Sequence, residues 1–211
     1  MQYDYIREPQ AIYDESFRQI RAETPALAGM PEDVTDLAVR IVHACGEPKV
    51  AEDLGWSDDI VRKGRAALVD GAPVIVDCRM AGDGIIASRL PADNTVLCPL
   101  TDERTYAIAK EIGNTRSAAA VELWKPDLEG AVVVIGNAPT ALFRLLEILH
   151  EGAPKPAAIL GFPVGFVGAA ESKEALIEAA HFGIPYMTLR GRRGGSAIAA
   201  AALNALAKNN Q

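Results

Sequence analysis

Short apolar runs bounded by turn residues recur along the chain from Pro73 onward, and this alternation constrains the fold more than any other feature. The runs are PVIVDC, NTVLCPL, GAVVVIGNAP, PAAILGFP and IPYMTLRG. Short unbroken apolar runs of this kind are typical of parallel strands buried on both faces. Most of them are followed by a helical segment, so the sequence predicts an open, mostly parallel α/β sheet with helices on both faces.

The helical segments divide into two groups. In the first third of the chain, the spacing predicts helices over 11–23, from Pro31 through His43, and over 57–71 with Ser57 as N-cap. Between and after the apolar runs, helices are expected over 102–112, 116–124, 138–151, 172–182 and 194–208. We therefore expect one domain over 1–211, with a mainly helical lead-in over 1–71 and a sheet region over 72–208.

Composition narrows the class of protein. The chain has 211 residues, 49% of them hydrophobic, which is ordinary for one soluble domain. Its 21 Lys and Arg against 28 Asp and Glu give a net charge of −7, which argues against general binding to nucleic acid or anionic membranes. MQYDYIREPQ does not resemble a signal peptide, and no apolar segment approaches the roughly 20 residues of a membrane span. We expect a cytoplasmic protein.

The cysteines and glycines match no common cofactor motif. Cys45, Cys78 and Cys98 cannot all pair internally and have no metal-binding spacing, so buried free thiols and no metal are expected. The sequence contains no G-x-G-x-x-G after its first strand, no phosphate-binding P-loop and no GxSxG or HExxH motif. Segment 81–85, AGDGI, is interpreted as a weak glycine turn.

The stretch LAVRIVHACG places one of three histidines in an apolar run. At about 100° per residue, an apolar stripe forms on one side of this helix, from Val34 to Cys45, and His43 falls on the opposite side with Val39 and Arg40. His43 is then either a solvated surface residue or a residue that faces a ligand or a partner subunit. In the second case, an imidazole that moves a proton without metal or redox group suits an isomerisation, and Arg40 could bind a carboxylate or lower the pKa of the imidazole.

Ligands of open α/β sheets bind beyond the carboxyl ends of the strands, and three such ends carry polar residues. In GNAPTALF, Asn137 and Thr140 flank a helix start that could bind an anion, or that is an ordinary capped turn. In GFPVGFVGAAESKE, glycines leave room for a flat ligand, Ser172 could cap a helix and Lys173 could reach across its first turn. In TLRGRRGGSA, three arginines precede Ser196 at a helix start.

The three arginines, Arg190, Arg192 and Arg193, contrast with the acidic whole chain. Guanidinium groups suit carboxylates and phosphates, so this cluster is interpreted as an anion clamp. The alternative is a solvated basic turn that pairs with surface Asp or Glu.

Four segments, RIVHACG, GNAPTALF, GFPVGFVGAAESKE and RGRRGGSA, resemble in order and interval the precorrin-8X methylmutase family of cobalamin (vitamin B12) biosynthesis. The resemblance covers essentially the whole chain. It implies an isomerase without cofactors that moves a methyl group from C-11 to C-12 of precorrin-8X, giving hydrogenobyrinic acid. It also implies that His43 is the proton donor and acceptor, and that the protein is a homodimer with its ligand site near the subunit interface.

The implied tetrapyrrole carries several acetates and propionates, and its binding residues are assigned here by chemistry and expected position. The expected partners of the carboxylates are Arg40, Arg116, Asn137, Thr140, Lys173, Arg190, Arg192, Arg193 and Ser196. Ser16 and Phe17 could close the pocket, Phe17 against the flat macrocycle, or could be ordinary helix packing.

Three alternatives stay open. The substrate could carry cobalt, as for a cobalt-precorrin-8 methylmutase that gives cobyrinic acid, although we favour the metal-free ring. The protein could be a tetrapyrrole carrier without catalysis. A methyltransferase using S-adenosylmethionine is disfavoured by the missing glycine-rich first turn.

Overall fold

Six strands form one sheet in the computed structural model, which describes residues 3–208. Their order is β1-β6-β5-β4-β2-β3, with β1 antiparallel to β6 and all other neighbours parallel. The strands are β1 (Leu54–Trp56), β2 (Val74–Val76), β3 (Val96–Leu97), β4 (Val132–Ile135), β5 (Ala158–Gly161) and β6 (Tyr186–Leu189). The predicted open, mostly parallel sheet is confirmed.

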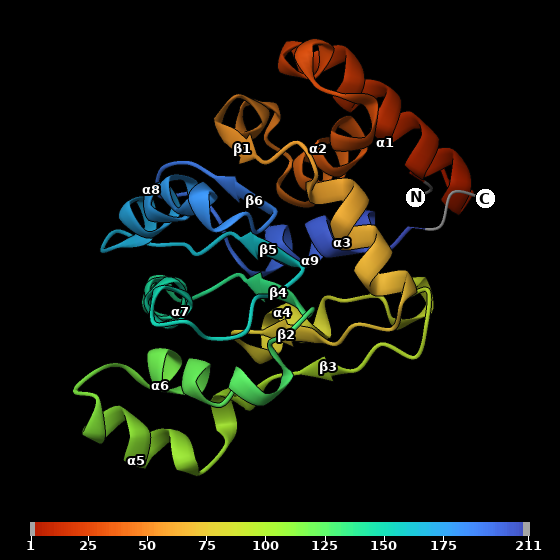
Figure 1. The fold of residues 1–211 in the computed structure, drawn as a ribbon. Helices are drawn as coiled ribbons and strands as arrows, with labels where there is room; N and C mark the ends of the chain where they lie inside the picture. Colours follow the sequence, from red (N-terminus) through yellow and green to blue (C-terminus); the bar gives the residue numbers. More distant parts are fainter. Residues whose placement is uncertain (1–2, 209–211) are drawn as a thin grey trace.

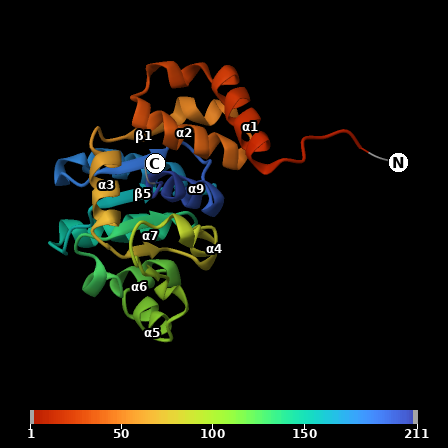
Figure 2. The ribbon, with the colours of Figure 1, turned by 90° about the vertical axis from the view of Figure 1, so that its right-hand side faces the viewer.

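Helices cover both faces of this sheet. Figure 1 shows the six strands in this order, from β1 at the top to β3 at the bottom. Helices α6, α7 and α8 lie on the left of the sheet, and α3 and α9 lie on the right. The helices are α1 (Pro9–Glu23), α2 (Glu32–Cys45), α3 (Ile60–Val69), α4 (Arg79–Asp83), α5 (Arg104–Glu111), α6 (Arg116–Glu122), α7 (Pro139–His150), α8 (Ala169–Glu178) and α9 (Ser196–Leu206). Turned by 90°, the ribbon shows α1 and α2 stacked beyond α9, at the end of the molecule opposite α5 and α6 (Figure 2).

Two apolar cores follow from the alternation of side chains along each strand. On β4, Val132 and Val134 pack in the core that also contains α2, α3 and α9. Val133 and Ile135 point to the other face and pack with α6 and α7. Residues of the helical lead-in pack in the first core together with residues of the sheet. The lead-in and the sheet region therefore share one continuous core.

The lead-in differs from its predicted form in one strand and one helix start. β1 was not predicted, because three residues with a central glycine show no clear apolar alternation. Ser57 does not cap α3, which begins at Ile60; its hydroxyl accepts a hydrogen bond from the N–H of Tyr186 at 3.0 Å and so extends the pairing of β1 with β6. The predicted glycine turn over 81–85 instead overlaps the short helix α4.

Helix α2 is buried on a wider arc than predicted. Val39, expected on the polar side, is 2% exposed, whereas Cys45, expected in the apolar stripe, is exposed. The reason is that α2 packs on α9 with one side and on α1 with another. Of the cysteines, Cys78 is buried and Cys98 half-buried, so the prediction of buried thiols is wrong for Cys45.

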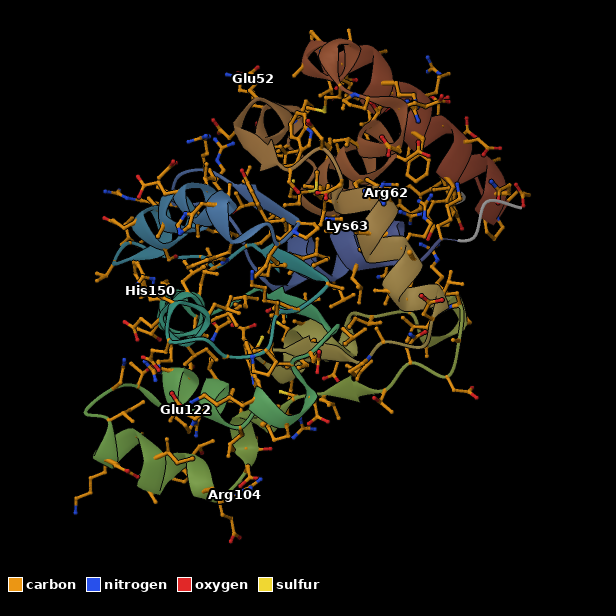
Figure 3. All side chains as sticks on the ribbon, in the orientation of Figure 1. Glu52, Arg62, Lys63, Arg104, Glu122 and His150 are labelled. Carbon is orange, nitrogen blue, oxygen red and sulfur yellow. The ribbon has the colours of Figure 1, made fainter. Side chains whose placement is uncertain are left out.

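Helices α6 and α7, which cover the other face of the sheet, are joined by ion pairs as well as by apolar contacts. Glu122 of α6 accepts from Arg144 of α7 at 2.5 Å and from Lys125 at 2.6 Å, and Figure 3 labels Glu122 with His150 of the same layer. Within residues 3–208, no helix combines the length and apolar character needed to cross a membrane.

A close backbone approach joins β4 to the start of α9. A Cβ on Gly136 would lie 2.7 Å from Cα of Ser196 and 2.9 Å from Cβ of Ala199. These atoms belong to backbone and to a buried helix, which cannot move aside cheaply. Glycine is therefore required here for packing.

Replacing this glycine should destabilise the fold. We expect Gly136→Ala to lower the free energy of unfolding by about 1–3 kcal/mol, because the added methyl overpacks the contact. The matched control is Gly29→Ala, where no atom lies within 4 Å of the added Cβ and a change within about 1 kcal/mol is expected. Urea unfolding followed by circular dichroism measures both; equal stabilities would contradict the packing argument.

Candidate functional site

His43 is exposed on the outer side of α2, in the last turn of that helix. The helix ends at Cys45, and the next residue, Gly46, adopts φ 65° while its N–H donates to the carbonyl of Val42 at 2.8 Å. This left-handed conformation favours glycine and turns the chain away from the helix axis shortly after His43. The imidazole is thereby left uncovered by the residues that follow.

Aromatic rings of α1 hold the imidazole on its other side. Its ring centroid lies 5.5 Å from that of Phe17, edge to face, and 5.8 Å from that of Tyr13. These distances are within the range of favourable aromatic contacts. His43 is therefore partly desolvated by α1 although it remains open to solvent.

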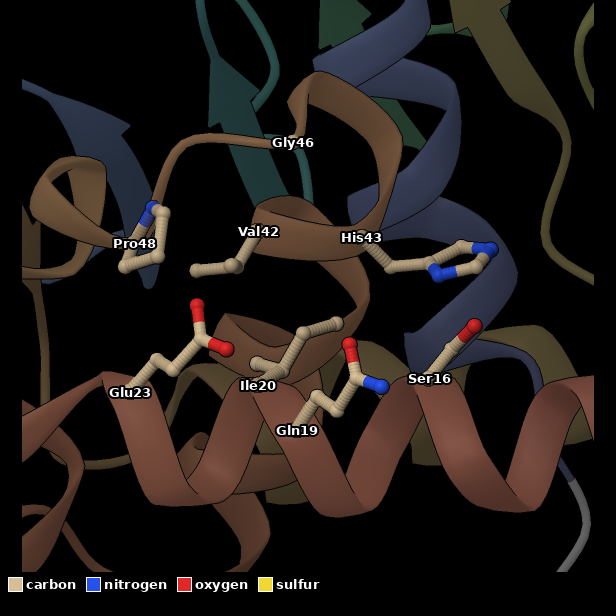
Figure 4. A pocket seen from close by; sticks show the side chains of 8 residues that line it. All are labelled: Ser16, Gln19, Ile20, Glu23, Val42, His43, Gly46 and Pro48. Atoms are coloured by element: carbon tan, nitrogen blue, oxygen red, sulfur yellow. The ribbon is translucent and has the colours of Figure 1, made fainter.

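A pocket of about 180 Å³ opens beside the ring, between α1 and α2. Figure 4 shows the side chains of Ser16 and His43 at one end of this pocket, with the Ser16 hydroxyl close to the imidazole. Glu23 and Pro48 lie at the other end. The full lining is Ser16, Gln19, Ile20, Glu23, Val42, His43, Gly46 and Pro48.

Arg40 lies one turn before His43 and shares its aromatic neighbours. Its guanidinium carbon is 5.1 Å from the ring centre of Phe17 and 5.7 Å from that of Tyr13, within cation–π range. Burial and the charge of Arg40 lower the pKa of His43 below its ordinary value of 6.5. The imidazole is then neutral at pH 7, with one N–H and one acceptor nitrogen.

The predicted anion site at the start of α7 is occupied from within the protein. The carboxylate of Asp77, 2% exposed, accepts from the N–H groups of Gly136 at 2.8 Å, Asn137 at 2.9 Å and Ala138 at 2.7 Å. Burial raises the pKa of Asp77, and the three hydrogen bonds oppose that rise. The N–H groups expected to bind a ligand anion thus bind Asp77, which corrects the prediction for this helix start.

The side chains around this turn are only partly free for a ligand. Thr140 shares a hydrogen bond of 2.8 Å with Thr115, the N-cap of α6, while the Asn137 side chain is exposed. Arg116, at the first position of α6, is exposed and donates to the Tyr106 hydroxyl at 3.0 Å. Arg116 therefore stays available on the surface.

The loop between β6 and α9 does not present its arginines as one cluster. Arg190 pairs with Glu174 at 2.5 Å, and Arg192 lies 5.2 Å from the ring centre of the exposed Phe166. Arg193 is exposed, but its carbonyl accepts from Lys173. The predicted clamp is thus divided among different partners.

Two residues of these loops are buried rather than ligand-facing. Lys173 is 0% exposed, and burial lowers its pKa to about 8. Ser196 is 8% exposed, with its hydroxyl 3.2 Å from the Cys78 sulfur. Ser172 lies inside α8 and donates to the Ala169 carbonyl at 3.1 Å, so it is not the predicted cap. Lys173 supports the loop through the Arg193 backbone.

The structure therefore brings together Ser16, Phe17, Arg40 and His43, and it places Arg116, on α6, away from them. Both views of the ribbon place α6 at the end of the molecule opposite α2 (Figures 1 and 2). Tyr13 joins the first group and was missed, although it precedes Phe17 by one helical turn on α1. Within residues 3–208, no three His, Cys, Asp or Glu side chains are grouped as metal ligands would be.

Fold and site together define an α/β protein that presents one histidine, flanked by aromatic and arginine side chains, on a helix outside a mostly parallel sheet. A model of the precorrin-8X methylmutase family matches residues 11–209. The precorrin-8X methylmutase of Pseudomonas aeruginosa is 60% identical over 208 residues, covering 99% of each chain. The chain therefore belongs to the precorrin-8X methylmutase family.

More distant relatives agree with this assignment. The cobalt-precorrin-8 methylmutase of Methanocaldococcus jannaschii is 38% identical over 175 residues, covering 82% of this chain and 79% of its own. A crystal structure of a precorrin-8x methyl mutase from Thermus thermophilus superposes with a TM-score of 0.85 at 35% identity, covering 96% of this chain and 100% of that one. The resemblance of the sequence motifs to this family is confirmed.

The influence of Arg40 on His43 can be measured directly. We expect Arg40→Gln to raise the pKa of His43 toward 6.5, because a nearby positive charge that disfavours the imidazolium is removed. Titration of the imidazole Cε1–H resonance by NMR measures this shift. Arg21→Gln is the control, since Arg21 pairs with Asp36 at 2.9 Å; an unchanged pKa in Arg40→Gln would show that the Arg40 charge does not reach the ring.

Proposed function

We propose that this protein converts precorrin-8X to hydrogenobyrinic acid by moving a methyl group from C-11 to C-12 of the tetrapyrrole ring. The observation that carries the proposal is the exposed imidazole of His43 beside the Phe17 and Tyr13 rings, in a chain that belongs to the methylmutase family. The migration is a rearrangement within a conjugated ring, so atoms and electrons balance without a methyl donor.

His43 would supply the proton transfer that this rearrangement needs. A neutral imidazole carries one donor and one acceptor nitrogen, so one ring can both give and take back a proton in a turnover. A depressed pKa also makes the imidazolium a stronger acid when it forms. General acid catalysis of this kind contributes about 10²–10⁴-fold, and positioning of the substrate contributes much of the remainder.

The residues near His43 would hold the macrocycle. Phe17 and Tyr13 offer apolar ring surface, Ser16 a hydroxyl beside the imidazole, and Arg40 a charge for a peripheral carboxylate. Arg116 and the exposed arginines Arg192 and Arg193 remain proposals for other carboxylates. Asn137 and Thr140 could bind the ligand only through their side chains. Lys173, Arg190 and Ser196 contact other residues of the protein, and they would influence ligand binding through those residues.

A metal-free substrate is favoured over its cobalt complex. The chain shares 60% identity with a relative named precorrin-8X methylmutase and 38% with one named cobalt-precorrin-8 methylmutase. Because that second relative is named for the cobalt-containing substrate, conversion of the cobalt complex to cobyrinic acid is the alternative reaction. Assays with both substrates would decide between them.

We also propose that the protein is a homodimer that works in the cytoplasm. Free thiols and a biosynthetic family support the compartment. The segment before α1 extends away from the body (Figure 2), and its Tyr3 and Tyr5 are 73% and 63% exposed. Phe166 and Val167, 83% and 89% exposed, form a second apolar patch. Exposed aromatic residues of this kind are typical of surfaces that contact a partner.

The proton-transfer role is tested by incubating protein with precorrin-8X alone and following the absorption spectrum. We expect conversion by the wild type and a loss of about 10²–10⁴-fold in His43→Ala, with binding retained. His150→Ala is the control, because His150 lies on α7 in the opposite layer. Binding without conversion by the wild type would favour a carrier, and a requirement for added S-adenosylmethionine would favour a methyltransferase.

The dimer is tested by sedimentation velocity. We expect the wild type to sediment as a dimer and a variant with Tyr3→Ser, Tyr5→Ser and Ile6→Ser to dissociate at higher protein concentration, because apolar contact is lost. Val69→Ser, which removes an exposed apolar side chain from the end of α3, is the control. A wild type that stays monomeric at all concentrations would contradict the proposal.

A further inference from the structure

A second cavity, of about 120 Å³, is enclosed by residues of α1, α2, α3 and the end of α9. Its charged lining consists of Arg21, Asp36, Arg40, Arg65 and Lys208. Four of these side chains are cationic and one is anionic. In a chain with a net charge of −7, this local excess of positive charge indicates a binding place for an anion.

The one acid of the lining is already paired with one of the cations. Arg21 donates to the carboxylate of Asp36 at 2.9 Å. Arg40 lies with its guanidinium carbon 5.1 Å from the ring centre of Phe17, and neither Arg40 nor Arg65 forms an ion pair within residues 3–208. Two guanidinium groups of one cavity are therefore left for a ligand.

Arg65 is fixed in place by the end of α9. Its Nε donates to the carbonyl of Leu206 at 3.2 Å, and the carbonyl end of a helix attracts a cation. This contact uses Nε alone. The two Nη groups make no hydrogen bond in the described part of the chain, and neither of them is buried. Arg65 therefore presents N–H donors to the cavity from a position that the backbone defines.

Acidic residues border Arg65 on its other side, without occupying its donors. There Arg65 lines a separate, open hollow together with Glu32, Asp33 and Asp36. Within residues 3–208, none of these carboxylates forms an ion pair with Arg65, and Asp36 is held by Arg21. Arg40 and Lys208 line only the cavity, so cations outnumber acids on that side of Arg65.

The cavity adjoins the surface on which His43 lies. Phe17 lines the cavity, and its ring centroid is 5.5 Å from that of His43. The same ring is in contact with Arg40. A flat ligand that covers Phe17 beside the imidazole would therefore reach the cavity with an acidic substituent at its edge.

We propose that this cavity binds one carboxylate of the ligand that His43 faces, with Arg40 and Arg65 as its guanidinium partners and Lys208 as a further positive charge. The chemistry of the site is that of a carboxylate; its identification as an acetate or propionate of the tetrapyrrole rests on the proposed function. A guanidinium group binds a carboxylate through two parallel hydrogen bonds, which fix orientation as well as affinity. The contact would hold one edge of the macrocycle relative to the imidazole.

Affinity is measured by absorption titration with two probes, hydrogenobyrinic acid and the same macrocycle with all its carboxylates converted to primary amides. We expect Arg65→Gln to bind the acid about 10- to 100-fold more weakly than wild type, and the amide about as well, because only the charged contact is lost. Arg65→Lys should lie between, since lysine keeps the charge and loses the planar fork. Lys208→Gln, at an exposed position, should weaken binding of the acid by a smaller factor.

A purely structural role for Arg65 predicts a different pattern. If Arg65 only stabilises the end of α9, Arg65→Gln loses the same factor with both probes, and Lys208→Gln loses nothing. Arg62→Gln is the matched control, because Arg62 is an exposed arginine of the same helix that does not line the cavity (Figure 3). It should match wild type with both probes.

Several outcomes would overturn the assignment of this cavity. They are unchanged affinity for the acid in both Arg65→Gln and Lys208→Gln, an equal loss for acid and amide, and a wild type that binds neither probe. Acetate that binds the wild type without competing with the acid would also overturn it, since the cavity would then hold a separate anion. If Arg65→Gln does not fold, Arg65→Lys and Lys208→Gln decide.

Failure of the proposed reaction gives a different result. A wild type that binds the acid but does not convert precorrin-8X would end the proposed reaction alone. In that case the carboxylate site still stands or falls on the ratio of acid to amide affinity in the variants.

Discussion

The burial of α9 between the sheet and α2 is the constraint on which the rest of the structure depends. Almost every residue of this helix is buried, and most are alanine, so the sheet and α2 can approach it closely on different sides. Gly136 meets its first turn, and Asn204 near its end fixes the loop that follows α4, by accepting a hydrogen bond from the N–H of Ile86. A helix with larger side chains could not hold these three neighbours at their present distances.

This packing also explains why the polar surface next to His43 is incompletely satisfied. α2 uses one side for α9 and another for α1, which leaves a narrow strip for His43 and Arg40. The aromatic rings on that strip desolvate both side chains without offering a carboxylate. The pocket beside His43 is lined by apolar and polar side chains together, and Phe17 and Arg40 border the neighbouring cavity. An aromatic ring next to a cation suits a flat ligand with peripheral acids.

Features that depend on contacts close in the sequence could be predicted from the sequence alone, whereas features that depend on distant contacts could not. The strands of the parallel sheet were predicted because their apolar runs are continuous, and β1 was missed because its pairing with β6 is set far along the chain. His43 was predicted correctly to avoid the core, whereas Val39 was misplaced because it packs in the apolar core that α2 shares with α9 and the sheet.

The loops at the strand ends differ from the site around His43, because their polar groups bind partners that lie far away in the sequence. The start of α7 has the sequence of an anion site, but Asp77, at the end of a neighbouring strand, occupies its N–H groups. Lys173, which is buried, and Arg190, which is exposed, likewise have partners within the protein. Among the predicted cations away from α2, Arg116 lies on a helix at the far end of the molecule. His43 and Arg116 thus lie at opposite ends of the subunit, so both would face the same macrocycle if the two ends belong to different subunits of the proposed dimer.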